Sequence, residues 1–284
     1  MKVTVLMAAY NSKADLLKET IESILNQTFS DFEFLIVDDG SKEPLEPIIK
    51  TITRDERVVV YRKENTGLGS SLTYGIRKAK GEYIARIDDD DVSVKDRIEK
   101  QVIFLDTHPE VSCVGGHIYY RYGDKIYPHT PFPLTHERII AKLVKMHFAM
   151  AHTTLMYRKD DVERIGCYRI PKGNEDLDLL LQLGTVGKLA NIDEYLTYYR
   201  LTHTGLSVTS PQKAKAYTYA LESALRYKGY SPNYDDIKSS LGLLQKGDKK
   251  KFLNKLFPSR RFFLIWMVQL FGKNVNHIET QFNK

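Results

Sequence analysis

The sequence predicts an α/β fold built on a mostly parallel, Rossmann-like sheet flanked by helices, with a helical C-terminal appendage. Two observations lead to this prediction. Short apolar runs alternate with amphipathic helical stretches over the first 110 residues, and polar clusters follow several of these runs. Such alternation is typical of parallel sheets whose crossover helices cover both faces. In these sheets ligands bind beyond the carboxyl ends of the strands.

Apolar runs predict the strands of the first 110 residues, and apolar residues at helical spacing predict the helices between them. Ser12 and Asp15 form an S-x-x-D pattern, which predicts a capped start for the first helix. The expected strands cover residues 3–9, 33–37, 58–61 and 83–87. The expected later helices cover residues 44–53, 67–79 and 96–105.

The pattern after residue 110 is less regular and mixes the two periodicities. Strands are expected over residues 111–116, 118–127, 153–157 and 195–200. Helices are expected over residues 134–145 and 175–183, and the pattern is helical again from residue 211. We therefore expect a second half of mixed strands and helices, followed by a helical region.

Composition excludes several classes of protein. The 284 residues are 42% hydrophobic and 27% charged, which is ordinary for a globular chain and too apolar for disorder. No run of 18 apolar residues predicts a membrane-spanning helix, and the N-terminal apolar run is too short for a signal peptide. Cys113 and Cys167 alone form neither a zinc site nor a disulfide framework, so we expect buried thiols in a cytoplasmic protein.

Charge is distributed unevenly along the chain. Residues 211–284 contain 14 basic and 5 acidic residues, a net charge of +9, whereas residues 1–210 contain 28 and 31. A basic stretch over 246–261 precedes an apolar, aromatic run that ends at Phe271. We expect residues 246–271 either to lie on a membrane surface or to form a helix packed on the rest of the chain or in a homodimer. No motif accompanies the charge that would predict a nucleic-acid partner.

Two acidic clusters directly follow predicted strands: Asp38-Asp39 and the run Asp88 to Asp91. Carboxylate oxygens suit Mg²⁺ or Mn²⁺, which bind through one or two carboxylates together with substrate phosphates. A solvated turn is the alternative for the four-residue run. A calcium loop starting at Asp88 fits less well, since Val92 and Ser93 would occupy a ligand and a glycine position.

The pair Gly67 and Gly69 invites comparison with a dinucleotide-binding loop. The third glycine of that fingerprint would fall at position 72, which is Leu72, and the pair follows a polar stretch instead of a strand. We therefore do not expect a nicotinamide or flavin cofactor.

Taken together, four segments resemble the inverting family 2 glycosyltransferases of the GT-A fold. They are VTVLMAAYNS, FEFLIVDDGS, ENTGLGSSLTYGIRKAKGEYIARIDDDD and GNEDLDLLLQL, and the resemblance covers roughly residues 1–205. It implies a catalytic domain over 1–210, with a nucleotide-binding half at 1–110 and an acceptor-binding half at 111–210. A basic helical region over 211–284 would follow.

The resemblance also implies roles for single residues. Asp88 and Asp90 match the D-x-D motif and would hold Mn²⁺ or Mg²⁺, with His203 as a further ligand. Asp89 stands where the family more often has a small residue, which leaves the register of the metal ligands open. The implied nucleotide contacts are Ala9, Tyr10, Asn11, Asp38, Asp39, Gly67, Asp88 and Asp89.

Asp176 matches the family's catalytic base, although acidic residues here also suit the cap of a helix. Glu175, His152 and Arg200 are expected on the acceptor or donor-sugar side. His147 and His152 are expected either on the acceptor side or in packing. Arg86, directly before the acidic run, is either a donor-phosphate contact or an ion-pair partner.

The expected activity is therefore inverting transfer of a hexosyl or N-acetylhexosaminyl group from a nucleotide sugar, with a UDP-sugar favoured. The acceptor would be a glycan or lipid-linked glycan, as in cell-surface polysaccharide synthesis at the inner face of the plasma membrane. One alternative is a metal-dependent nucleotidyltransferase, although residues 8–12 contain none of the glycines that its phosphate loop would need. The other is a sugar-nucleotide- or glycan-binding module without catalysis.

Overall fold

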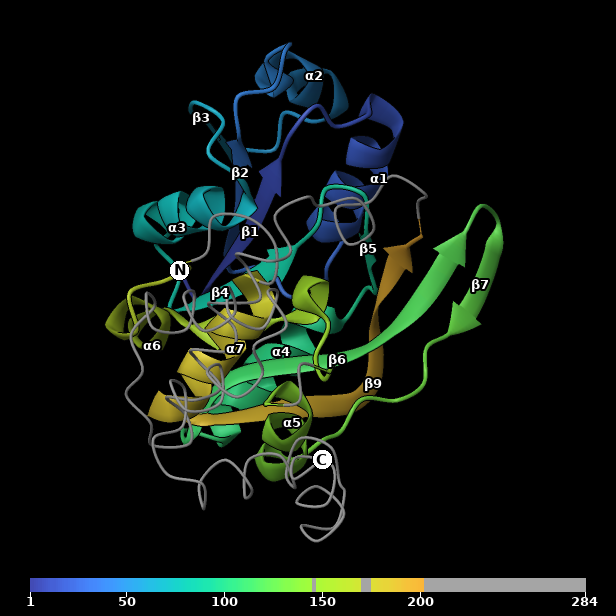
Figure 1. Cartoon of the computed structure of the whole chain (residues 1–284). Coiled ribbons are helices and arrows are strands. Elements are labelled where there is room, and N and C mark those ends of the chain that lie inside the picture. The colour runs from blue at the N-terminus through green and yellow to red at the C-terminus, as the bar shows by residue number, and fades with distance from the viewer. Residues whose placement is uncertain (145–146, 170–174, 202–284) are drawn as a thin grey trace, which may run out of the picture.

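A computed structural model describes residues 1–144, 147–169 and 175–201 of the chain. These residues form one nine-stranded sheet in the order β3-β2-β1-β4-β8-β6-β9-β5, with β7 paired to β6 (Figure 1). The expected helical appendage over 211–284 lies outside the described residues. Within them, no helix is both long and apolar enough to cross a membrane.

The first half is the predicted parallel sheet. Strands β1 and β2 pair in parallel, as do β1 and β4, and β2 and β3, which confirms the alternation seen in the sequence. The strands are β1 (Val3–Ala9), β2 (Phe32–Asp38), β3 (Val58–Arg62) and β4 (Tyr83–Ile87). The helices are α1 (Ala14–Leu25), α2 (Leu45–Ile52), α3 (Leu68–Lys78) and α4 (Arg97–Thr107).

The second half is mixed. Strand β8 is antiparallel to both β4 and β6, β6 and β9 are parallel, and β5 and β7 add antiparallel pairs. The strands are β5 (Val92–Ser93), β6 (Val111–Tyr122), β7 (Lys125–Pro128), β8 (Met156–Arg158) and β9 (Lys188–Arg200). The helices are α5 (His136–Leu143), the 3₁₀ turn η1 (His152–Thr154), α6 (Lys159–Arg164) and α7 (Glu175–Val186).

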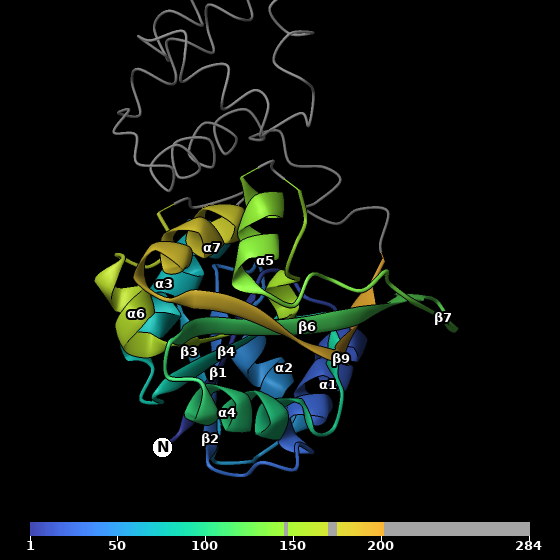
Figure 2. The same cartoon turned by 90° about the horizontal axis from the view of Figure 1, so that it is seen from below.

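Helices cover both faces of the sheet. Helices α1, α2 and α4 pack their buried apolar residues against one face, and α3, α5, α6 and α7 pack theirs against the other. Figure 2 shows α4 and α5 on opposite sides of β6 and β9. Strands β1, β2 and β4 are buried throughout, which explains why they appear in the sequence as continuous apolar runs.

Four local predictions were wrong. Residues 111–122 form one strand, not two, because Gly115 and Gly116 permit close packing here; a Cβ on Gly116 would lie 2.4 Å from Leu196 Cδ1. The chain turns back only at Gly123, in left-handed backbone. Residues 152–154 are a 3₁₀ turn, and the strand expected over 153–157 covers Met156–Arg158 instead.

The other two corrections concern a helix cap and a strand. Helix α1 begins after Lys13 with no side-chain cap, because the Ser12 hydroxyl donates to Asp89 instead of capping the helix. Strand β9 begins seven residues earlier than expected, at Lys188. Its polar residue Asn191 is buried and donates to the carbonyls of Pro133 and Ala149, so the strand tolerates a polar side chain in its interior.

Candidate active site

The Asp38 carboxylate, at the carboxyl end of β2, binds groups of the loop that follows this strand and of the end of β3. Asp38 is buried and accepts hydrogen bonds from the backbone N–H groups of Ser41 (2.9 Å) and Leu45 (3.1 Å), which lead into α2. Arg62, at the end of β3, lies 3.2 Å from the same carboxylate. Gly40 lies between these contacts in left-handed backbone, and a Cβ there would come 2.6 Å from the backbone nitrogen of Asn65. The loops after β2 and β3 therefore touch directly.

Asp39, the next residue, also accepts several hydrogen bonds. Lys63 Nζ lies 2.5 Å from it, and the backbone N–H groups of Thr66 and Gly67 donate to it at 3.0 and 2.9 Å. Burial raises the pKa of the Asp39 carboxyl, but Lys63 and the N–H donors outweigh this effect and hold the pKa below its ordinary value. The carboxylate is therefore ionised and fixes the loop before α3.

The β1 end lies beside these loops, since Ala9 and Asp38 are in register. Asn11 takes a left-handed backbone conformation, donates its N–H to the Ser41 hydroxyl (2.9 Å) and accepts from the N–H of Lys42 (2.8 Å). The Ala9 carbonyl accepts from the N–H of Asp39. Tyr10 is exposed, so its side chain is accessible to a ligand at this edge.

The acidic run from Asp88 to Asp91 follows β4 at the same edge of the sheet. Burial raises the pKa of Asp89 to about 6 and that of Asp90 to about 7, with further increases from the neighbouring carboxylates. Burial also raises the pKa of the fully buried Asp91, to which Asp88 and Asp90 add. These carboxylates therefore oppose one another's ionisation, and a solvated turn does not describe them.

Two buried arginines lie under this run. Both terminal nitrogens of Arg86 bind the Asp88 carboxylate, so the ion-pair role expected as one of two alternatives for Arg86 is present. Arg97 donates to the Arg86 carbonyl (2.6 Å) and to the side chains of Ser93 and Gln101. Burial, together with the charge of Arg86, lowers the pKa of Arg97 to about 9. These contacts fix the backbone from which Asp88 projects.

Arg200 supports the other side of the run. Its backbone N–H donates to Asp91 (2.8 Å), and its Nε donates to the Asp90 carbonyl (3.0 Å). Its guanidinium also lies 3.0 Å from Glu19, which Arg121 contacts as well. The end of β9 is thus tied to the acidic run, 109 and 110 positions apart along the chain.

Asp176, in the first turn of α7, faces this edge. Burial raises the pKa of its carboxyl, the Leu177 N–H (2.8 Å) and the charge of Arg86 lower it, and the charge of Asp88 raises it. Helix α7 packs in the same core cluster as Ile84 of β4, and the charges of Arg86 and Asp88 act on Asp176, so this residue lies on the side of the molecule that carries the end of β4. Its hydrogen bond to Leu177 also gives it the helix-capping role that was the alternative interpretation.

Glu175 and His152 lie in the same neighbourhood. His152 Nε2 is 2.7 Å from the Tyr168 hydroxyl, and burial together with Arg86 holds the pKa of His152 well below its usual range, so the ring is neutral. Burial raises the pKa of Tyr168, and the charge of Glu175 adds to this increase. His147 is exposed, and His203 lies outside the described residues.

No group of three or more His, Cys, Asp or Glu side chains in the described part of the chain is arranged to hold a metal by itself. The repulsion among Asp88, Asp89 and Asp90 nevertheless favours a cation there, and Mg²⁺ or Mn²⁺ needs only one or two carboxylates when phosphate oxygens complete its coordination. The donor set therefore fits such an ion. Cys113 and Cys167 are buried free thiols, as expected, and take no part.

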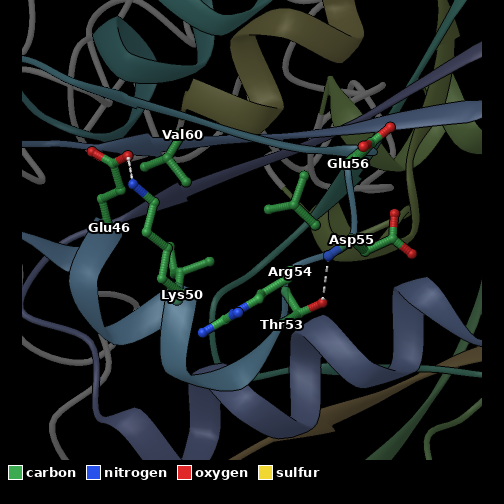
Figure 3. Close-up of a pocket in the computed structure, with 9 residues that line it drawn as sticks. Glu46, Lys50, Thr53, Arg54, Asp55, Glu56 and Val60 are labelled. Atoms are coloured by element: carbon green, nitrogen blue, oxygen red, sulfur yellow. Dashed lines mark hydrogen bonds and ion pairs between the residues drawn. The ribbon is translucent and has the colours of Figure 1, made fainter.

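A groove between α2 and β3 lies elsewhere. Lys50, Arg54 and Glu56 are among its lining residues, with Glu46 paired to Lys50 (Figure 3). Residues 53–56 of its lining precede β3, so the groove lies toward the amino ends of the parallel strands. It is therefore distinct from the acidic edge and offers nothing to the candidate site.

Comparison with known proteins identifies the family. The family model described as "Glycosyl transferase family 2" matches residues 4–166. The chain belongs to glycosyl transferase family 2. The O-antigen biosynthesis glycosyltransferase WbnJ of Escherichia coli is 31% identical, over 79% of this chain and 89% of that protein. The amylovoran biosynthesis glycosyltransferase AmsE of Erwinia amylovora is 28% identical, over 80% and 88%.

Solved structures show that this family 2 chain has the GT-A fold. S. aureus TarS (residues 1–349), in complex with UDP-GlcNAc, matches 95% of this chain and 80% of its own, with a TM-score of 0.67 and 18% identity. The mannosyltransferase PcManGT of Pyrobaculum calidifontis, in complex with GDP-Man and Mn²⁺, matches 96% and 88%, with a TM-score of 0.57 and 16% identity. The resemblance stated from the sequence motifs is thereby confirmed for family and fold.

Sequence reasoning missed the residues that hold the carboxylates in place. Lys63 contacts Asp39 on another loop, Arg97 donates to the Arg86 carbonyl of β4, and Glu19 pairs with Arg200 of β9. No local pattern distinguishes these three residues from solvated charges. Arg97 had one available signal, since it stands on the buried face of an amphipathic helix where a cation is rare.

Proposed function

We propose that this family 2 glycosyltransferase transfers a sugar, with inversion, from a UDP-sugar to a hydroxyl of a glycan or lipid-linked glycan in cell-surface polysaccharide synthesis. One observation carries the proposal: the first turn of α7 contains Asp176, α7 packs in the same core cluster as Ile84 of β4, and the charges of Asp88 and Arg86 at the end of β4 act on the Asp176 carboxyl. The carboxylate proposed to accept the proton, Asp176, and a carboxylate proposed to bind the donor, Asp88, would thus lie at one edge of the sheet.

Asp176 is the proposed base. The attacking hydroxyl must lose a proton, and a positioned carboxylate that accepts it contributes typically about 10²–10⁴ in rate. Burial raises the pKa of Asp176, which makes its ionised form a stronger base, while Arg86 limits the rise and favours ionisation. A single displacement assisted by one base inverts the anomeric carbon, and no second carboxylate is required as a nucleophile.

The nucleotide is proposed to bind across the ends of β1, β2 and β4. Tyr10 offers an exposed ring, and Asp39 is the proposed acceptor for the N3–H of uracil at the edge where Ala9 and Asp38 are in register. The remaining proposed contacts are Ala9, Asn11, Asp38, Asp88 and Asp89.

Asp90 and Asp88 are the proposed ligands of a Mn²⁺ or Mg²⁺ ion, with His203 as a further candidate. When bound, the ion would neutralise negative charge on the diphosphate leaving group. Arg86 holds Asp88 in place for this role, and Arg200 fixes the Asp90 backbone. Glu175, His152 and Arg200 are proposed on the acceptor or donor-sugar side, in keeping with the neutral, firmly held His152 ring.

Substitution of Asp176 separates this proposal from its rivals. With constant Mn²⁺, we expect Asp176→Asn to lower acceptor-dependent UDP release by about 10²–10⁴, with UDP affinity retained. Asp160→Asn, in an exposed position of α6, is the control and should behave like the wild type. Equal rates for Asp176→Asn and wild type would remove Asp176 as the base. A nucleotidyltransferase would instead release pyrophosphate, and a binding module would release nothing.

We further propose a cytoplasmic location with peripheral membrane contact through residues 246–271, on the strength of their basic and aromatic composition. The full chain should then sediment with anionic liposomes at low salt and remain in the supernatant when residues 246–284 are deleted. A full chain that stays in the supernatant argues instead for packing on the rest of the chain or in a homodimer, and light scattering would distinguish these two.

A further inference from the structure

Aromatic side chains form a row across three strands at the side of the sheet away from β1. Tyr120 of β6 is in register with Tyr199 of β9 and with Tyr127 of β7. Residues in register on neighbouring strands project to the same face of a sheet. The row and three further rings packed beside it, His129, Phe132 and Phe148, are called the aromatic platform below.

The platform is buried on its inner side and open on its outer side. His129 stacks on Phe132 with ring centroids 4.6 Å apart, and Phe148 meets Phe132 edge-on at 5.0 Å. Phe132 is 3% exposed, whereas Phe148 and Tyr127 are 48% and 52% exposed. Part of the platform therefore supports the rest, and the outer rings face solvent in the described part of the chain.

None of the six platform side chains carries a charge at neutral pH. Burial lowers the pKa of His129, so its ring is neutral. Arg121 and Ile126, which pair with each other, occupy the alternate positions of β6 and β7 and project to the opposite face, where Arg121 contacts Glu19. The platform thus combines ring surfaces with tyrosine hydroxyls.

The platform is continuous with the active site. Ala151 packs against Phe132 and Ile118, and the next residue is His152, which binds Tyr168 beside Arg86. Phe148 precedes His152 by four residues, so the two Cα atoms are at most about 14 Å apart.

We propose that the aromatic platform binds the acceptor glycan, one or more sugar units away from the hydroxyl that reacts. This inference rests on the proposed function. A sugar ring presents C–H faces bordered by hydroxyls, which match aromatic faces bordered by phenolic O–H groups. A hydrocarbon partner would bury those phenolic groups without hydrogen bonds, at a cost in free energy. Binding energy from such remote sugar units can be used to orient the reacting hydroxyl.

Binding of the full chain to an array of bacterial surface glycans tests the proposal. We expect Tyr127→Ala and Phe148→Ala each to weaken binding by roughly tenfold or more, the loss expected for one well-packed aromatic ring. Ile126→Ala is the matched control, because Ile126 is adjacent, 51% exposed and on the opposite face. It should bind glycans like the wild type.

A parallel measurement of UDP affinity distinguishes failure of the platform from failure of the proposed function. If the wild type binds UDP but no glycan on the array, or if all variants bind glycans equally, the platform proposal is wrong and the glycosyltransferase proposal stands. If no nucleotide binds with or without Mn²⁺, the proposed function itself fails. Loss of sedimentation with phosphatidylglycerol vesicles in Tyr127→Ala, with glycan binding intact, would make the platform a membrane contact and overturn the proposal.

Discussion

The two acidic clusters at the edge of the sheet differ in how their charges are balanced. Asp38 and Asp39 each lie against a cation and accept two backbone N–H donors, and the pKa of Asp39 is lowered. In the run from Asp88 to Asp91, by contrast, burial and mutual repulsion raise the pKa values of three of the four carboxyls. Both clusters follow parallel strands, yet in the second, among the described residues, only Asp88 binds a cationic side chain, that of Arg86.

This difference indicates different roles for the two clusters. Carboxylates that are already neutralised and hydrogen-bonded stabilise the fold and give the ligand site its shape. Carboxylates that repel one another store an electrostatic cost, which a bound cation would relieve. The run from Asp88 to Asp91 is therefore where binding of a metal–diphosphate complex would relieve the most electrostatic repulsion. Asp38 and Asp39 instead fix the loops that a nucleotide would contact.

The largest expected effect comes from neutralising one carboxylate of the unbalanced cluster. Asp90→Asn should lower sugar transfer by about 10³ or more, since a metal ion typically supplies several kcal/mol of charge stabilisation in the transition state. The variant should also lose the increase in melting temperature that Mn²⁺ gives the wild type in the presence of UDP. Retention of both activity and the Mn²⁺ effect would show that the ion is held elsewhere.

The sequence predicted the positions of the two carboxylate clusters better than it predicted the residues that contact them. The strands before Asp38 and Asp88 appeared as apolar runs because both faces of the parallel half are covered by helices. The position of both clusters at one edge then followed from parallel pairing alone. What could not be predicted was which cluster is balanced, since the partners of Asp39 come from residues 63–67, on another loop.

The second half was harder to predict for a related reason. Polar residues such as Asn191 and Thr197 are buried inside β9, and their presence hid the strand from a periodicity argument. The motif around Asp176 located the start of α7 correctly, but its proximity to Asp88 depends on β8 and β6 entering the sheet next to β4. That order is a property of tertiary packing, which no local pattern contains.

A second, smaller effect tests the balanced cluster. Asp39→Asn should lower the free energy of unfolding by about 2–4 kcal/mol, because it leaves Lys63 without its buried partner and weakens two hydrogen bonds to backbone N–H groups. Urea unfolding of the metal-free protein measures this change. Asp124→Asn, in the exposed turn between β6 and β7, is the control and should remain within about 0.5 kcal/mol of the wild type. An Asp39→Asn variant as stable as this control would contradict a structural role for Asp39.

The smallest effect is a dependence of stability on pH that has opposite signs in the two clusters. The pKa of Asp90 is raised from 3.8 to about 7 by burial and its neighbours, so the native state retains a proton that the unfolded state loses between these pH values. The contribution of Asp90 to stability therefore falls as pH rises from about 4 to about 7. The pKa of Asp39 is lowered, so its contribution is present above the unfolded pKa and is lost only as pH falls through the lower, folded value.

The Asp90→Asn variant tests the pH dependence of the stability that Asp90 contributes. In metal-free protein, the variant should exceed the wild type in unfolding free energy by about 1–2 kcal/mol at pH 7, allowing for screening by solvent, and by much less at pH 4. Urea unfolding at pH 4, 5.5 and 7 in the presence of a chelator measures the difference. A gain of equal size at all three pH values would mean that the substitution improves packing and that Asp90 is not electrostatically strained. A gain that grows with pH, and that Mn²⁺ with UDP reverses in favour of the wild type, would tie the strain in this cluster to the ion it is proposed to bind.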